Sequence, residues 1–156
     1  MQAVRQGANR PDLEALVADL APSVRSGTTL RGYAAVPVTL GLVERSGGRD
    51  LALTSSGKRF ARSGDLRILR EALVSRVLGV RELLEEVAKG PTTCPQLTER
   101  LADRGIWWNH PMAVRYRVWW LVSAGAIDTK RDSRVDRLTL SRAGRQLLAR
   151  SRASAN

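Results

Sequence analysis

Basic side chains of the kind that bind phosphate are concentrated in the last third of this chain. From Arg104 to residue 156, 11 basic residues stand against Asp128, Asp132 and Asp136, a local excess of +8 within a net charge of +11. Such a surface attracts polyanions, because each neutralised phosphate releases condensed counterions. Arg and Asn can also make paired hydrogen bonds to guanine and adenine edges. The candidates are Asn109, His110, Arg115 and Arg117, followed by Lys130, Arg131, Arg134 and Arg137.

Side chains for catalysis or metal binding form no recognisable pattern. The one histidine, His110, has no Ser, Cys or Asp at a spacing typical of a nucleophilic site, and no glycine-rich phosphate loop occurs. The one cysteine, Cys94, excludes an internal disulfide, and the His and Cys count is too low for a dedicated zinc site. Adjacent Glu85 and Glu86 are expected on a solvated helix face. We therefore expect a protein that is not an enzyme and uses neither a metal nor a cofactor.

Two stretches about 84 residues apart repeat one sequence pattern. The first has LGLVE at 40–44, a polar break, and LALTSSGKRFA at 51–61; the second has AGAID at 124–128, a polar break, and LTLSRAGRQLL at 138–148. Each copy predicts a helix that ends at a glycine, two short strands joined by a charged turn, and a helix that begins at Thr54 or Ser141. The repeat therefore predicts two small units of similar fold.

The other elements follow from apolar spacing and from turn residues. Helices are expected over residues 11–20, 28–40, 65–76, 80–89, 93–104, 111–124 and 142–150, with hairpins near 42–54 and 126–140. Pro37 should kink or shorten the end of the second helix. The predicted fold class is mainly α with small β-hairpins. The predicted organisation is an N-terminal unit at 1–62, a linking helix at 63–79, a C-terminal unit at 80–150 and a flexible tail at 151–156.

The order of three helices, a strand, a turn and a strand over residues 80–148 resembles a winged helix-turn-helix domain, and residues 11–61 resemble it less closely. The run VRYRVWWL at 114–121, followed by Gly125, Leu140-Ser141 and Gly144, is similar to the winged-helix modules of Mrr-type restriction endonucleases. The whole chain resembles tandem winged-helix DNA-binding proteins of bacteria. The resemblance implies two winged-helix units packed in tandem, the first one degenerate, and the sequence carries no nuclease carboxylate cluster.

The resemblance also implies a role for each group of basic residues. Asn109 and His110 would lie at the start of a recognition helix, with Arg115 and Arg117 on the two flanks of its apolar stripe. The basic hairpin would contact the DNA backbone or the minor groove, although Asp132 and Asp136 alternate with its basic residues and could pair with them. The first unit offers a weaker set, which consists of Arg31 in its helix and Arg45 and Arg49 in its hairpin.

The four tryptophans lie in one short region, at positions 107, 108, 119 and 120. If the stripe of Val114, Val118, Leu121 and Val122 faces the core, Tyr116, Trp119 and Trp120 point largely the other way. Three interpretations remain open. The aromatic rings pack inside the protein, form a patch that binds a partner or a second copy, or stack on unpaired bases.

Composition limits where in the cell the protein is expected, and two hypotheses for its function remain. An apolar content of 43% suffices for a packed core, and the sequence shows neither a signal peptide nor a membrane span. We therefore expect a cytoplasmic, nucleoid-associated bacterial protein. The first hypothesis is duplex DNA binding, as a regulator or as the DNA-reading component of a larger system. The second is a protein-interaction adaptor that dimerises or binds a partner through Tyr116, Trp119 and Trp120.

Overall fold

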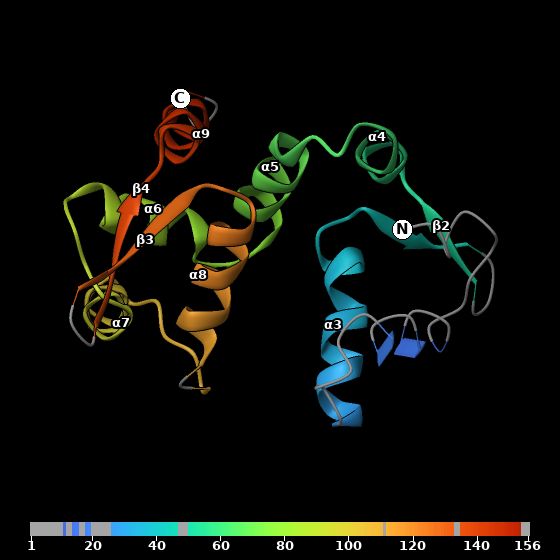
Figure 1. Cartoon of the computed structure of the whole chain (residues 1–156), viewed down its shortest axis with the longest axis horizontal. Helices are drawn as coiled ribbons and strands as arrows, with labels where there is room; N and C mark the ends of the chain where they lie inside the picture. Colours follow the sequence, from blue (N-terminus) through green and yellow to red (C-terminus); the bar gives the residue numbers. More distant parts are fainter. Residues whose placement is uncertain are drawn as a thin grey trace. The chain divides into compact units, whose positions relative to one another are not determined.

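The chain is described by a computed structural model that covers residues 11, 14, 15, 18, 19, 26–46, 50–110, 112–132 and 135–153, with side chains at all of these except 28–30, 132 and 135. This part of the chain is mainly helical and contains two antiparallel hairpins, which confirms the predicted fold class (Figure 1). It divides into unit 1, Met1–Ala72, and unit 2, Leu73–Asn156. The boundary falls inside α5 (Leu66–Arg76), within the segment predicted as a linking helix. Of the helix predicted at 11–20, the described residues 11, 14, 15, 18 and 19 are helical, and the other five lie outside the described residues.

Unit 1 contains α3 (Gly27–Thr39), β1 (Val43–Arg45), β2 (Leu51–Leu53), α4 (Ser55–Ser63) and the first residues of α5. The two strands pair in the register Val43 to Leu53. Pro37 lies inside α3, and the helix ends two residues later. A small core is formed by residues of α3 and both strands, with one side chain of α4 packed against it: Ala34, Val43, Leu51, Leu53 and Ala61.

Unit 2 contains α6 (Val80–Ala88), α7 (Cys94–Asp103), α8 (Ala113–Ser123), β3 (Ile127–Asp132), β4 (Val135–Leu140) and α9 (Arg142–Ala153). The last helix therefore extends three residues beyond the prediction. α6 packs against α7, α9 and β4, and α8 packs against α7 and β3. The core consists of side chains that are almost fully buried: Leu83, Leu84, Leu97, Leu101, Leu121, Ile127 and Leu138.

The segment between α6 and α7 joins the hairpin of unit 2. The N–H groups of Thr92 and Leu138 each donate to the carbonyl oxygen of the other, at 3.1 and 2.8 Å. Through this antiparallel bridge, Thr92 pairs with β4 at the edge of the sheet formed by β3 and β4. Immediately after it, Thr93 and Gln96 cap α7 reciprocally, which fixes where this helix begins. The hairpin, α7 and α8 are thereby held together in unit 2.

The two units share the same hydrogen bonds at the end of each hairpin. In unit 1 the Thr54 hydroxyl donates to the Gly41 carbonyl at 2.7 Å and accepts from the Gly57 N–H at 3.1 Å. In unit 2 the Ser141 hydroxyl donates to the Gly125 carbonyl at 2.7 Å and accepts from the Gly144 N–H at 3.0 Å. The offset between the copies is 84 residues before the hairpin and 87 after it, because the second hairpin is longer.

The same offsets relate the two cores. Each core residue of unit 1 has a buried apolar counterpart in unit 2: Ala34 and Val118, Val43 and Ile127, Leu51 and Leu138, Leu53 and Leu140, Ala61 and Leu148. The sequence repeat is therefore a repeat of packing as well.

The glycine in each shared turn is required by a close approach of the backbone. A Cβ atom at Gly57 would collide with the carbonyl oxygen of Leu42, and one at Gly144 would collide with that of Ala126. We expect Gly57→Ala and Gly144→Ala each to cost about 1–3 kcal/mol of stability, the range for overpacked sites. Gly32, which is exposed on α3 with open space around it, is the control, and Gly32→Ala should be neutral or stabilising. Urea unfolding of the three variants checks this, and equal midpoints would contradict the shared turn.

Candidate nucleic-acid interface

The helix α8 has one buried and one exposed face. Val114, Val118 and Leu121 are buried, as predicted, and Val122 is half-buried. On the other side Arg115, Tyr116 and Trp119 are exposed. The exposed face of α8 therefore combines one basic and two aromatic side chains.

Arg115 lies near the start of α7. Its positive charge acts on the thiol of Cys94, the first residue of α7, and Asp136 of β4 acts electrostatically on the same thiol. Burial raises the pKa of Cys94, and the positive charge of Arg115 offsets part of that rise. An exposed arginine of α8 and a charged residue of the hairpin thus both act on the first residue of α7.

Arg117 is engaged inside unit 2. Its Nε donates to the Leu78 carbonyl and its Nη1 to the Ala113 carbonyl, both at 2.9 Å. Its guanidinium carbon lies 4.3 Å from the centre of the Trp108 ring, a cation–π contact. Burial lowers the pKa of Arg117. These contacts engage the guanidinium of Arg117 within unit 2, whereas that of Arg115 is on an exposed side chain.

The two residues predicted at the start of α8, Asn109 and His110, are both exposed. The Nδ1 of His110 accepts a hydrogen bond from the Met112 N–H at 3.1 Å, so the second ring nitrogen is the one left for an outside partner. The His110 ring stacks on Tyr116, with 6.2 Å between the ring centres, and Tyr116 meets Trp119 edge to face at 5.6 Å. Three aromatic rings therefore follow one another along the exposed face of α8.

The pairing register separates the basic residues of the second hairpin into two faces. Lys130 lies opposite Arg137, and Arg131 lies opposite Asp136. Directly opposite residues share a face of an antiparallel pair, so Lys130 and Arg137 lie together on one face, which by the alternation of β3 also carries Asp128 and Asp132. Arg131 and Asp136 continue the face that carries Ile127 and Leu140 into the core, where pairing across the hairpin can occur. Arg134 lies outside the described residues.

The candidates of unit 1 are more sparse. Arg31 is exposed on α3, and Arg45 is exposed on β1, where it lies opposite Leu51. Arg49 lies outside the described residues. Tyr33, two residues after Arg31, is 41% exposed.

The tryptophans divide between packing and exposure. Trp108 is half-buried and lies so close to Gly79 that a Cβ there would meet its ring. Its buried indole N–H has no hydrogen-bond partner among the described residues. Trp107 is 71% exposed, Trp119 is 48% exposed and Trp120 is half-buried. Internal packing therefore accounts for Trp108, whereas Trp107 and Trp119 present their rings to solvent.

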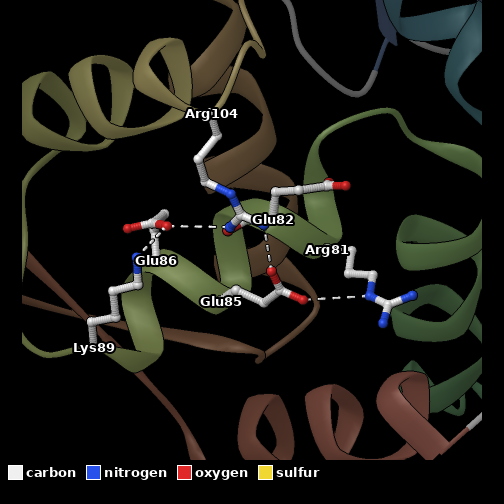
Figure 2. A network of polar contacts seen from close by, with 6 residues as sticks. All are labelled: Arg81, Glu82, Glu85, Glu86, Lys89 and Arg104. Atoms are coloured by element: carbon white, nitrogen blue, oxygen red, sulfur yellow. Dashed lines mark hydrogen bonds and ion pairs between the residues drawn. The ribbon is translucent and has the colours of Figure 1, made fainter. Parts of the chain in front are cut away.

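The expectation that Glu85 and Glu86 lie on a solvated face is wrong for Glu86, which is only 1% exposed. Figure 2 shows both carboxylates reaching Arg104: Glu85 at 2.8 Å and Glu86 at 3.2 Å. Lys89 also binds Glu86, at 2.7 Å, and Arg81 binds Glu85, at 3.5 Å. The charged cluster ties α6 to the residue that follows α7, and so fixes the start of the loop that leads to α8.

The cluster predicts a dependence of stability on pH. A hydrogen bond from Arg104 lowers the pKa of Glu85. Burial raises the pKa of Glu86, but hydrogen bonds from Lys89 and Arg104 outweigh the effect of burial. The pKa of Glu86 is therefore also lowered from 4.5. Both carboxylates therefore stabilise the fold fully at a pH above the pKa that they have in the unfolded chain. They lose that contribution as the pH falls through the lowered pKa of the folded chain. We expect Arg104→Ala to cost roughly 1–3 kcal/mol near neutral pH and much less in acid.

Denaturant unfolding at pH 7 and at successively lower pH checks this expectation. Arg81→Ala is the control, because Arg81 contributes one partly exposed ion pair and should cost under about 1 kcal/mol. If Arg104→Ala lowers the free energy of unfolding by the same amount throughout the acid range, the role assigned to the two carboxylates is contradicted.

Comparisons with protein-family models, curated proteins and solved structures find no match to this chain. Among the residues that the structure describes, no group of three His, Cys, Asp or Glu side chains could hold a metal ion. Within the same part of the chain, no helix has both the length and the apolar character to cross a membrane.

Proposed function

We propose that this chain binds duplex DNA, with unit 2 acting as a winged helix. In this proposal α8 enters the major groove and Arg115 reads a base edge. The hairpin is the wing, whose Lys130 and Arg137 contact phosphates. The protein then serves as a regulator or as the DNA-reading part of a larger system.

The observation that carries the proposal is the convergence around Arg115. An exposed arginine on α8 lies near the start of α7, and the hairpin brings Lys130 directly opposite Arg137. The element order of unit 2 and the bridge between Thr92 and Leu138 are those expected for a winged helix. The excess of basic residues after position 104 supplies the electrostatic attraction that any DNA-binding surface needs.

The proposal is tested by selecting bound sequences from a random duplex pool with the full chain. We expect enrichment of a defined site, and relaxed preference at one position of it for Arg115→Ala, at a cost of about 1–3 kcal/mol. Failure to retain any duplex at low salt would defeat the proposal.

A second candidate, a protein-interaction adaptor, is favoured by one observation: Tyr116 is 39% exposed and meets the more exposed Trp119 edge to face. Large exposed aromatic side chains are typical of interface hot spots. Trp119→Ala separates the two functions. If it abolishes self-association in sedimentation while DNA affinity survives, the aromatic face is an interface; if DNA affinity falls and the sedimentation is unchanged, the face serves DNA.

A further inference from the structure

Aromatic rings occupy the middle of the exposed face of α8. Each residue of an α-helix is turned by about 100° from the one before it, so Tyr116 and Trp119 lie on the side opposite the buried Leu121. By the same geometry Arg115 lies toward one edge of that face. His110, which precedes the helix, stacks on Tyr116, and Tyr116 meets Trp119 edge to face. A continuous row of rings therefore occupies the surface that the proposed function turns toward DNA.

The charge of the same stretch favours a nucleic acid as the occupant of this row. No acidic residue occurs from Ile106 to Ile127, a stretch that includes the loop before α8 and the whole of that helix. Arg115, within the same stretch, is exposed. Surfaces on which proteins stack bases combine aromatic side chains with positive charge in this way, because the rings meet the bases while the cations meet the backbone.

A fully paired duplex offers these rings little to contact. In the major groove the base pairs present hydrogen-bonding groups and, on thymine, one methyl group, whereas the faces of the bases are covered by their neighbours in the stack. A base outside the stack exposes its whole face to a ring. Taking a paired base out of the stack costs free energy, and this cost is least where the base is already unpaired.

We infer that the DNA ligand contains an unpaired base and that this base stacks on the rings of Tyr116 and Trp119. This inference rests on the proposed DNA binding of unit 2 and names the kind of duplex that unit 2 binds. Arg115, at the edge of the same face, contacts the base pair next to the unpaired base. The row of rings and the arginine then serve one ligand, in which the rings select the unpaired base and the arginine selects its neighbour.

The test compares a duplex selected by the full chain with versions of it that each lack one base, which leaves the opposite base unpaired. We expect one version to bind at least about fivefold more tightly than the paired duplex, the lower end of what one stacked base contributes. Trp119→Ala and Tyr116→Ala should each lose this preference. Trp119→Phe keeps a ring and should retain it, whereas Trp119→Leu keeps apolar bulk without a ring and should lose it. Melting temperatures check that each variant is folded.

The control is Trp107→Ala, because Trp107 is also exposed but lies before α8, and its replacement should leave the preference intact. If no version binds more tightly than the paired duplex, or if Trp119→Leu retains the preference, the inference is overturned and the proposed function stands. It is equally overturned if Trp119→Ala abolishes self-association in sedimentation but keeps the preference, since the rings then bind a second copy. If no duplex is bound, paired or not, the proposed function fails as well.

Discussion

Replacing Lys130 and Arg137 together by glutamate is expected to lower the affinity for every duplex by at least about tenfold, whatever its sequence. The two residues lie directly opposite each other on one face of the β3–β4 hairpin. Both side chains are exposed, so we expect a phosphate to reach them from solvent. Asp128 and Asp132 lie on the same face of β3, so the melting temperature of the double variant is measured alongside its affinity.

The salt dependence makes this prediction specific. Each phosphate contact that is lost should reduce the slope of log affinity against log salt by about 0.9, so the double variant should lose close to 2. The matched control exchanges the charges of the other pair, Arg131→Asp with Asp136→Arg, and leaves the net charge unchanged. If both double variants bind equally well, or if the loss depends on DNA sequence, then the hairpin does not act as a phosphate-contacting wing.

Replacing Arg117 by alanine is expected to destabilise unit 2 by roughly 2–4 kcal/mol. The variant loses charge-assisted hydrogen bonds to the Leu78 and Ala113 carbonyls and the cover over the Trp108 ring. The Leu78 carbonyl then loses the hydrogen bond that it accepts from Arg117, and the half-buried indole of Trp108 loses the guanidinium packed on its ring. Thermal and denaturant unfolding measure the loss.

Arg117→Lys is the control for charge. An ammonium cannot span two carbonyls and stack on an indole at the same time, so this variant should still lose a substantial part of the stability while its electrostatic attraction to DNA is unchanged. Unaltered stability of Arg117→Ala together with relaxed base preference would mean that Arg117 reads DNA, as its place beside the apolar stripe first suggested.

The difference between Arg115 and Arg117 shows where sequence-based prediction stops. Both arginines flank the same apolar stripe of α8, and helical periodicity treats them alike. Their environments differ because residues distant in sequence, Leu78 and Trp108, lie against one flank, while Cys94 lies near the other. The loop at 106–110 carries no periodic signal from which the position of Trp108 could be predicted.

Local signals, by contrast, predicted the hairpins and the ends of most helices. Thr54 and Ser141 begin helices where the sequence places them, and Gly41 and Gly125 adopt the left-handed backbone expected after a helix. Two adjacent acidic residues predict a solvated face, and this prediction is wrong for Glu86. The buried Leu83, Leu84 and Val87 around it leave only a narrow polar side on α6. Of the two cations that compensate its charge, Lys89 is three residues away and Arg104 is 18 residues away.

Binding of duplex DNA by unit 2 is best examined through the affinity of the full chain for its selected duplex, measured as a function of salt. We predict tight binding near about 50 mM salt and a linear fall of log affinity with log salt, with a slope of about −0.9 for each phosphate contacted. Absence of binding to any duplex at that salt, or an affinity that salt leaves unchanged, would contradict it.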